Sequence, residues 1–466
     1  MHRWTDGHAG FCGRIGAART DITPPIGIYA RNWGAAAHDA AEGIHRPLTA
    51  TVLSIRSEEG GPPAVLASLD LGWWRRPDDE RFLRAAVLER TGLDPARLII
   101  ALTHTHAGPA VCLADAARPG GHLIAPYLER VRNALADAAA AAMASEEPAL
   151  LEWTAGRCGL ARNRDLPDPS RDRLLCGYRP DAEADDTLLV GRVTARDGRP
   201  IATIVNYACH PTTLAWTNRL ISPDYVGALR DVVEAASDGA PCLFLQGASG
   251  ELAPRRQYVG DPSVADANGR ELGHAAAAAL AGMLPPGERL RFRGALESGA
   301  PLAVWELEPC LPGSALLCRR IEVEVPLQPW PSPAELKAQL AGAPDPAQRE
   351  RLERKLRIRL ALGEGSTARM PVWVWRLGDS ALLGLPNEAY SYLQRTLRSR
   401  LAGAPVAVAT VANGHTGYLP PSGLYDRDAY PVRQTPFARG SLERVTEACV
   451  AAAAEMLRDE PGGNPQ

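Results

Sequence analysis

Short apolar runs rich in β-branched residues alternate with longer helical stretches along most of the chain. Such runs predict strands over residues 51–55, 64–69, 98–102, 202–207 and 242–245. The segments between them predict helices over residues 79–91, 125–145, 225–237 and 266–283. This alternation predicts an α/β fold whose largely parallel or mixed sheet is covered by helices. A ligand or metal site is then expected at the carboxyl ends of the strands.

The pattern changes in the second half of the chain. Residues 329–364 form a charged stretch that is broken near Pro344, which predicts a helical hairpin inserted into the domain. Such a hairpin is either a solvated surface element or a lid over the site. We see no linker and no internal repeat, so we expect one domain over residues 13–460, with a flexible N-terminus (1–12) and a tail (461–466). Further strands are expected over residues 320–325, 372–377, 381–385 and 406–411, and helices from about residue 388 and over residues 441–457.

The composition excludes several classes of function. With 45% hydrophobic residues, 23% charged residues and a net charge of −3, the 466-residue chain resembles an ordinary globular protein, and we expect no nucleic-acid partner. No run of about 18 apolar residues occurs, so no membrane span is expected. The nine cysteines are scattered without a Cys-x-x-Cys pair, and no secretory signal is seen, which predicts reduced thiols and a cytoplasmic location. The composition leaves the oligomeric state open, a homo-oligomer included.

Two histidines follow directly after one predicted strand. Residues 103–109 read Thr-His-Thr-His-Ala-Gly-Pro, so His104 and His106 come just after an apolar run. Side chains two apart on an extended chain point the same way, and neutral imidazole is a favoured zinc ligand. The alternative is a pair of hydrogen-bonded structural histidines.

Other candidate ligands also follow predicted strands. His210 ends the next such run, although a single histidine there would also fit a core role. Glu388 follows residues 381–385, where a helix start would equally explain a glutamate because of the helix dipole. As the carboxylate partner of a two-histidine site, Glu388 completes a His/His/Glu set of three ligands with an open position, which a catalytic zinc needs. His415 and Tyr418 are further candidates, at the start of a long loop over residues 413–439.

At these positions the sequence resembles the neutral, non-lysosomal ceramidase family. Residues 103–109 match the family signature Thr-His-Thr-His-Ser-Gly-Pro, and residues 218–224 match its Asn-Arg-Leu-Ile-Ser-x-Asp run. Residues 386–388, Pro-Asn-Glu, resemble its Pro-Gly-Glu turn, and residues 413–418 resemble its Asn-x-x-x-x-Tyr pattern. The resemblance runs from about residue 13 to residue 450.

The resemblance implies a ligand set and roles for other residues. One Zn²⁺ per chain would be held by His104, His210, Glu388 and Tyr418, with His106 beside it as an acid–base residue. Two softer matches imply that Arg164 and Tyr430 bind the scissile carbonyl. The residues expected to contact substrate are Asn163, Asp224, His415 and Tyr425.

The chain also departs from the family pattern. The family segment Gly-Asp-Val-Ser-Pro-Asn reads Gly-Glu-Leu-Ala-Pro-Arg over residues 250–255, so its serine is Ala253. The C-terminal immunoglobulin-like domain of true ceramidases has no counterpart in these 466 residues. We therefore expect a ceramidase-like catalytic domain that acts on a ceramide-like or smaller N-acyl amide. Trp73, Trp74 and Trp216 are candidates for lining an apolar groove, or for simple packing.

The predicted function is zinc-dependent hydrolysis of an amide bond by activated water. A zinc-dependent esterase or lactonase and a non-catalytic zinc-binding relative are the alternatives. A cysteine hydrolase is less favoured, because Cys209 and its neighbour His210 point to opposite faces of a strand. A serine hydrolase is also disfavoured, since residues 247–250 are one residue short of Gly-x-Ser-x-Gly.

Overall fold

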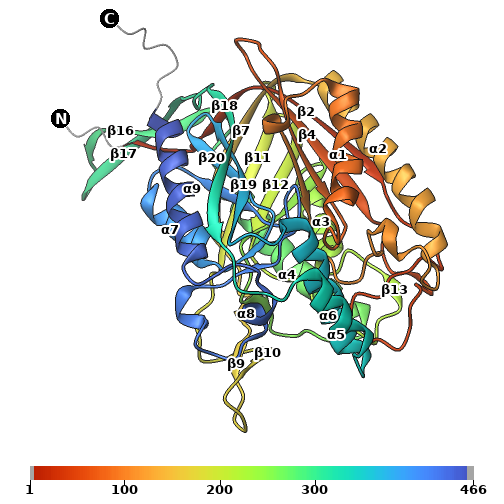
Figure 1. The fold of residues 1–466 in the computed structure, drawn as a ribbon. Helices are drawn as coiled ribbons and strands as arrows, with labels where there is room; N and C mark the ends of the chain where they lie inside the picture. Colours follow the sequence, from red (N-terminus) through yellow and green to blue (C-terminus); the bar gives the residue numbers. More distant parts are fainter. Residues whose placement is uncertain (1–4, 459–466) are drawn as a thin grey trace, which may run out of the picture.

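A strongly twisted eight-stranded sheet forms the centre of the protein, which is described by a computed structural model covering residues 5–458 (Figure 1). Five of its seven neighbouring strand pairs are antiparallel and two, at the edges, are parallel, so the sheet is mixed. In sheet order the strands are β14 (Cys242–Gln246), β12 (Pro200–Tyr207), β11 (Thr187–Ala195), β7 (Glu147–Arg157), β2 (Gly10–Asp21), β4 (Thr49–Ser57), β5 (Ala64–Leu69) and β6 (Leu98–Leu102).

The five strands predicted in the first half all lie in this sheet, but three of its members were not predicted. β2, β7 and β11 contain glycine and charged residues that interrupt the apolar pattern. Gly16 in β2 shows why a glycine is needed there, because a Cβ atom would lie 2.1 Å from the carbonyl oxygen of Ala142 in a covering helix. This strand is therefore stabilised by close packing against the helix, and its residues carry little local β propensity.

Helices cover the outer face of this sheet, as predicted. They are α1 (Pro77–Thr91), α2 (Ile124–Ala144), α3 (Tyr225–Ala235) and α4 (Pro262–Ala281). The helices α1 and α2 pack on one half of the sheet, where Leu83 and Leu128 meet Val65. The helices α3 and α4 pack on the other half, where Leu229 and Leu272 meet Phe244.

A second sheet packs against the inner face of the first. It consists of β18 (Leu316–Pro326), β19 (Thr367–Leu377), β20 (Ser380–Gly384) and β22 (Val406–Ala409). Trp375 and Leu382 of this sheet share a buried cluster with Leu245 of the large sheet. Its far face is covered by α7 (Tyr392–Arg400) and α9 (Ser441–Arg458), seen opposite α1 and α2 in Figure 1. The result is a four-layer arrangement of helices, sheet, sheet and helices.

The charged stretch forms the predicted helical hairpin. Its helices α5 (Pro333–Ala341) and α6 (Pro346–Leu362) pack on each other, with a break at Pro344. Ser332 and Glu335 form a capping box at the start of α5, and Asp345 caps α6. In Figure 1 the hairpin lies across the lower half of the molecule.

The remaining elements are short or peripheral. An arm consists of β1 (Thr5–Gly7), β16 (Glu288–Glu297) and β17 (Pro301–Pro309). Paired short strands are β3 (Gly43–Ile44) with β13 (Leu220–Ile221), β8 (Ala161–Asn163) with β15 (Leu252–Pro254), β9 (Asp165–Pro167) with β10 (Leu174–Cys176), and β21 (Glu388–Ala389) with β23 (Tyr418–Leu419). One short helix, α8 (Tyr430–Gln434), and four 3-10 turns complete the fold: Pro95–Arg97, Leu113–Asp115, Gly121–Leu123 and Ser422–Leu424.

Two expected boundaries differ from the structure. The N-terminus was expected to be flexible through residue 12, but β1 pairs with β16 and β2 enters the large sheet at Gly10. A helix was expected from about residue 388, but α7 begins at Tyr392 and Glu388 lies in the short strand β21. The expected tail, 461–466, lies outside the described residues. Within residues 5–458, no helix has both the length and the apolarity that crossing a membrane requires.

The twist of the large sheet decides where its strand ends meet. β6 and β12 run in opposite directions along the sheet and are separated by six pairing steps. At about 20–25° per step, the twist accumulates to roughly 120–150°, which turns their carboxyl ends toward the same side. The two sheet edges also approach each other, since Ser68 Oγ of β5 donates to the carbonyl oxygen of Phe244 in β14 over 2.5 Å. The residues that follow β6 and β12 are thereby brought together.

Candidate metal centre and catalytic cavity

His104 is fixed by the backbone around the end of β6. Its φ angle is 68°, in the left-handed region, and its backbone N–H donates to the carbonyl oxygen of Leu71 over 3.0 Å. The ring nitrogen Nδ1 lies 3.0 Å from the carbonyl oxygen of Gly72, which can only accept. Nδ1 therefore carries the proton, and the lone pair is on Nε2, which is buried and has no hydrogen-bond partner.

His210 is held in the same manner after β12. Its Nδ1 lies 2.6 Å from the carbonyl oxygen of Ser249, so its lone pair is also on Nε2. That Nε2 lies 2.9 Å from Oε2 of Glu388, and the ring of His210 is 5.0 Å from the ring of His104. Burial, and after it the charge of Arg164, lowers the pKa of His210 to about 3.

Glu388 completes the convergence from the second sheet. Its backbone N–H donates to the carbonyl oxygen of Gly417 over 2.9 Å, and β21 pairs with β23, which explains why no helix starts here. Its Oε1 lies 2.9 Å from His415 Nε2, while its Oε2 lies 3.4 Å from His104 Nε2. Burial alone would raise the pKa of Glu388, but the surrounding histidines hold it well below its usual value.

This arrangement fits a cation. With both rings neutral, the Nε2 lone pairs of His104 and His210 face the Oε2 of an ionised Glu388, so three acceptors converge. Arg164 Nη2 also lies 3.2 Å from His210 Nε2. Imidazole nitrogen and carboxylate oxygen are the donor types that zinc takes. The nearest nitrogens of His104, His106 and His210 all lie within 4.8 Å of one another, so this group could hold a metal ion.

Tyr418 stands next to Glu388 in the ladder between β21 and β23. Its ring stacks on the ring of His210 at 6.4 Å and 14°. Its hydroxyl oxygen accepts from Arg164 Nη2 over 3.2 Å. The fourth ligand expected from the resemblance therefore lies beside the other three.

His106 lies on the cavity side of the cluster. Its ring is flanked by Trp33 at 5.2 Å and Trp73 at 5.0 Å. Its Nε2 is buried without a hydrogen-bond partner, as is that of His104. Burial, with His104 and His210 nearby, lowers the pKa of His106 well below its usual value. A ring nitrogen that is free and faces a cavity is available to a substrate.

Arg164 and Tyr430 flank the cluster from two other segments. Arg164 follows β8 and is buried, with Nε and Nη2 donating to the carbonyl oxygen of Gly250 over 3.1 and 2.8 Å. Tyr430 begins α8 and packs its ring edge-on against Tyr418 at 5.6 Å. Its hydroxyl accepts a hydrogen bond from Arg354 of α6.

A cavity of about 290 Å³ opens in front of these residues. Seven of the expected site residues form one side of it, and α6 forms the other. Its lining includes His104, His106, Arg164, Glu388, His415, Tyr418 and Tyr430 on the first side, and Ala347, Glu350, Arg351 and Arg354 on the second. His210 lies directly behind this lining.

Three expected substrate-binding residues are not among those that line the cavity, so their contact with a substrate stays a prediction. Asp224 is fully buried and uses its two carboxylate oxygens to accept from the backbone N–H groups of Leu214 and Tyr225, at the start of α3. Asn163 accepts from the backbone N–H of Asp165 over 2.9 Å. Tyr425 donates to the carbonyl oxygen of Phe437 over 2.9 Å. Each of these groups is used within the fold.

Several cavity residues were not predicted from the sequence. Trp33 and Tyr258 contact each other and Trp216, and the first two line the cavity. Arg354 and Glu350 also line it, from the charged hairpin. In the sequence, Arg354 and Glu350 are marked only by a dense run of charged residues in α6, which is equally typical of a solvated helix.

The cysteine alternative finds no support at Cys209. The thiol is fully buried, and burial raises its pKa well above the ordinary value, so a thiolate is disfavoured. Ser249 lies next to His210, but its Oγ is 3.1 Å from Nδ1, the nitrogen that already faces the carbonyl oxygen of Ser249. Neither side chain is arranged as an activated nucleophile.

The fold and site together define a four-layer α/β protein with a candidate histidine–carboxylate metal centre at the ends of its strands. A comparison with protein-family models gives no match, and no curated protein matches the sequence. Among solved structures, the neutral ceramidase from Pseudomonas aeruginosa has the same fold, with a TM-score of 0.67 at 17% identity over 98% of this chain and 77% of that chain. A second, "Ceramidase complexed with C2", gives 0.68 at 17% identity over the same shares. The ceramidase resemblance predicted from four short motifs is thus confirmed at the level of the fold.

Proposed function

We propose that the protein is a zinc-dependent hydrolase that cleaves the amide bond of an N-acyl amide. The observation that carries this proposal is the convergence of His104 Nε2 and His210 Nε2 on Oε2 of Glu388, beside a cavity of about 290 Å³. Motif order and the ceramidase fold support it, since the structural neighbours are described as ceramidases.

The ligands in this proposal are His104, His210, Glu388 and Tyr418. When bound, zinc supplies a Lewis acid that polarises a carbonyl group and lowers the pKa of water toward neutrality. His415 orients Glu388 through the 2.9 Å contact between Nε2 and Oε1. Supporting contacts of this kind fix the ligand geometry of metal sites.

Arg164 and Tyr430 are proposed to bind the carbonyl oxygen of the scissile amide. Arg164 has a fixed guanidinium, because three of its hydrogen bonds anchor it to Gly250 and Tyr418. A donor fixed in a buried site stabilises negative charge on oxygen without having to reorganise. Tyr430 is held in place by Arg354 and adds a hydroxyl on the same side of the cavity.

His106 is proposed to move the proton. It is the one histidine of the cluster whose ring lies between two tryptophans at the cavity, and its Nε2 has no partner in the described protein. An amine is a poor leaving group until it is protonated, so a positioned imidazole is needed near the amide nitrogen. A His106→Ala variant that keeps zinc but retains near-full turnover would contradict this role.

The test is metal content together with turnover. We expect about one zinc per chain by elemental analysis of the purified protein, and loss of that zinc in a His104→Ala/His210→Ala variant. Lauric acid release from N-lauroyl amides is expected to disappear with the metal and return when zinc is restored to the chelated wild type. A panel of esters and lactones, assayed in the same way, shows whether the protein prefers amides or esters. Zinc that survives the double substitution would refute the ligand set.

A further inference from the structure

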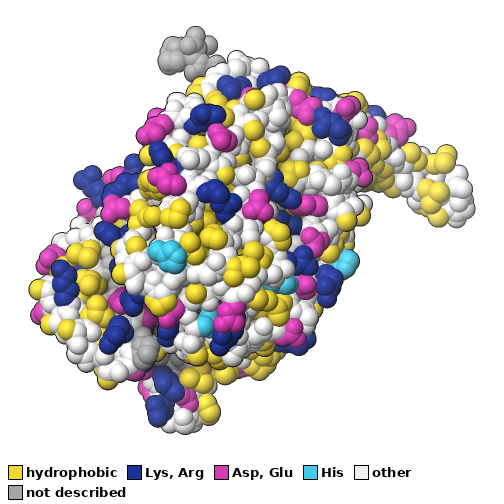
Figure 2. Space-filling model, turned by 90° about the vertical axis from the view of Figure 1, so that its right-hand side faces the viewer, with side chains coloured by type: hydrophobic (Ala, Val, Ile, Leu, Met, Phe, Trp, Pro, Cys, Tyr) yellow, Lys and Arg dark blue, Asp and Glu magenta, His cyan; other side chains and the backbone are white. Residues whose placement is uncertain are grey.

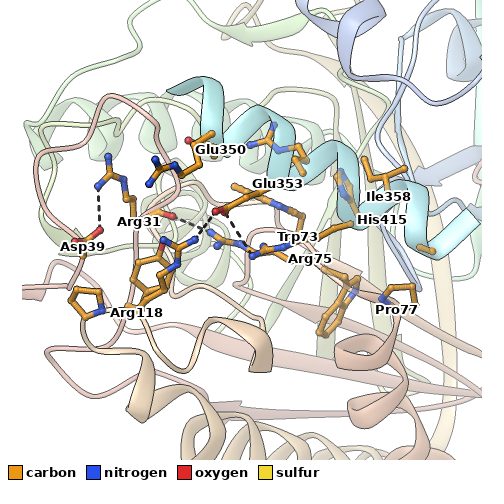
Figure 3. A pocket seen from close by; sticks show the side chains of 17 residues that line it. Arg31, Asp39, Trp73, Arg75, Pro77, Arg118, Glu350, Glu353, Ile358 and His415 are labelled. Carbon is orange, nitrogen blue, oxygen red and sulfur yellow. Dashed lines mark hydrogen bonds and ion pairs between the residues drawn. The ribbon is translucent and has the colours of Figure 1, made fainter. Parts of the chain in front are cut away.

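A second chamber adjoins the catalytic cavity. It has a volume of about 260 Å³ and shares Trp73, Glu350, Arg354 and His415 with that cavity. Figure 3 shows α6 crossing it, with Glu350 and Glu353 on that helix facing Arg75 and Arg118 on the opposite side. These four shared residues place the chamber directly next to the cavity at the histidine cluster.

The chamber carries an excess of positive charge. Its lining contains three carboxylates, Asp39, Glu350 and Glu353, against six arginines: Arg31, Arg75, Arg118, Arg349, Arg354 and Arg357. Six minus three leaves an excess of three, and counting the buried Asp115, which lies behind Arg75 and Arg357, still leaves two. The whole chain, in contrast, has a net charge of −3. On the face shown in Figure 2, basic and acidic side chains are interspersed.

Aromatic rings hold two of these arginines in place. The guanidinium of Arg75 lies over the rings of Trp73 and Tyr29 at 5.6 and 5.8 Å, and that of Arg354 lies over Trp73 at 5.4 Å. Stacking on aromatic faces holds a guanidinium plane in place. Arg75 is held further by hydrogen bonds to Asp115, Asn32 and the carbonyl oxygen of Arg31, and Arg354 by hydrogen bonds to Tyr430 and Glu350.

Donors remain available at the chamber. Arg118 pairs with Glu353 over 2.7 Å through one nitrogen. Among the described residues, the guanidinium of Arg349 has one hydrogen bond, to the carbonyl oxygen of Ala343 at 3.5 Å. A guanidinium has five N–H donors, so these contacts leave most of them unused. Planar donor pairs of this kind match the oxygens of a carboxylate or a phosphoryl group.

We propose that this arginine chamber binds an anionic group, a carboxylate or a phosphoryl group, carried by the same substrate whose amide lies at the histidine cluster. The inference rests on the proposed function and names its substrate class: an N-acyl amide with a negative charge, in place of an uncharged lipid amide. An uncharged substrate would remove water from the arginines without forming ion pairs with them. The desolvation of these charged groups would then weaken its binding.

The test uses substrate pairs that differ only in the anionic group. N-lauroyl-6-aminohexanoate is paired with N-hexyl lauramide, and N-lauroyl-O-phosphoethanolamine with N-lauroylethanolamine, with lauric acid release as the readout. We expect kcat/KM to be at least tenfold higher for one anionic member than for its uncharged partner. The preferred pair tells a carboxylate from a phosphoryl group. Equal or lower values for both anionic members would overturn the inference while leaving amide hydrolysis intact.

The variant Arg118→Gln/Arg349→Gln tests the chamber itself. We expect the ratio of kcat/KM within the preferred pair to fall at least fivefold, through KM of the anionic member. A general structural fault would lower both members and keep the ratio. Lys337→Gln is the matched control, because it removes an exposed cation from α5 of the same hairpin that does not line the chamber, and the ratio should not change.

Failure of the proposed function is distinguishable from failure of this inference. If no amide is hydrolysed, calorimetric titration with N-lauroyl-6-aminohexanoate and N-hexyl lauramide measures binding directly. Tighter binding of the anionic compound, weakened at least fivefold in Arg118→Gln/Arg349→Gln, supports the chamber even without turnover. Equal binding of both compounds contradicts it.

Discussion

The two sides of the cavity beside the candidate metal centre are built in different ways. The inner wall, defined as His104, His106, His210, Glu388 and Tyr418, comes from segments that follow four different strands. The outer wall, defined as Ala347, Glu350, Arg351 and Arg354, comes from the single helix α6.

The anchoring of the two walls differs as well. In the inner wall, the rings of His104 and His210 are fixed by backbone carbonyl oxygens of neighbouring loops, and Glu388 is fixed by a strand ladder. In the outer wall, Arg354 pairs with Glu350 of the same helix, donates to Tyr430 and lies over the ring of Trp73. Partly exposed ion pairs contribute little to stability, so such a wall can change its charge without loss of the fold. The comparison teaches that the candidate metal ligands are placed at the ends of strands, while the charged residues that line the cavity are placed on the inserted helix.

Glu388→Ala should have the largest effect. Removing this carboxylate takes away a proposed ligand and leaves the histidines without their partner. We expect loss of bound zinc and of turnover, measured by elemental analysis and lauric acid release. His415→Ala, which removes only the group that orients Glu388, should weaken zinc affinity by about 10–100-fold. If the two variants bind zinc equally well, Glu388 is not a ligand.

Arg164→Gln should leave the metal in place and lower the rate. Loss of a positioned donor to a developing oxyanion typically costs about 10²–10³ in kcat. Zinc content and the circular dichroism spectrum should stay at wild-type values, which separates this effect from misfolding. A reduction confined to KM would show that Arg164 binds substrate without stabilising the transition state.

Glu251 supports the inner wall and should make its stability depend on pH. The carboxylate is buried and accepts from the backbone N–H and hydroxyl of Ser391; burial nevertheless raises its pKa to about 7. Because the folded state then holds the proton more tightly than the unfolded state, stability falls as pH rises from the unfolded value near 4.5 to about 7.

As the pH rises from 5 to 8, the ionisation of Glu251 should lower the free energy of unfolding by about 2–3 kcal/mol. Urea unfolding of wild type and Glu251→Gln at both pH values measures it, and the variant should lose that part of the pH dependence. An identical pH dependence in the two proteins would contradict the raised pKa.

Arg354→Gln, in the outer wall, should have a smaller effect on the protein than Glu388→Ala, Arg164→Gln or Glu251→Gln. Its guanidinium donates to the hydroxyl of Tyr430, and a hydrogen bond from a charged group contributes about 1.5–3 kcal/mol at most. We expect KM to rise by about tenfold with zinc content unchanged, in steady-state assays beside Lys337→Gln. Loss of zinc in Arg354→Gln would mean that the two walls are not independent.

Much of the inner wall could be predicted from the sequence because its residues carry local signals. An apolar run that ends in a histidine is visible at His104 and at His210, and the motif order placed Glu388 and Tyr418 with them. The helical hairpin was visible as a charged stretch broken by Pro344. Glu388 was assigned to a helix, because the parallel pairing of β21 with β23 involves residues 30 positions apart and leaves no local trace.

The substrate side could not be predicted in the same way. Asp224 looked functional in a matched motif, yet its carboxylate caps α3, and only its burial reveals that. Arg354 and Glu350 looked like an ordinary solvated helix surface, yet they line the cavity. A charged residue on a helix gives no sign of what its helix packs against.

The sequence by itself determined which side chains are available for metal chemistry and where strands deliver them, since apolar periodicity and strand-end histidines are local patterns. The tertiary structure alone decided that β6 and β12, which run in opposite directions along one sheet, turn their ends toward each other, because twist accumulates over six strand pairs. It alone also placed six arginines from distant segments around one chamber beside the candidate metal centre. The amino-acid sequence determines the charge of each residue. The electrostatic field at a site, however, depends on which of these residues the fold brings close together.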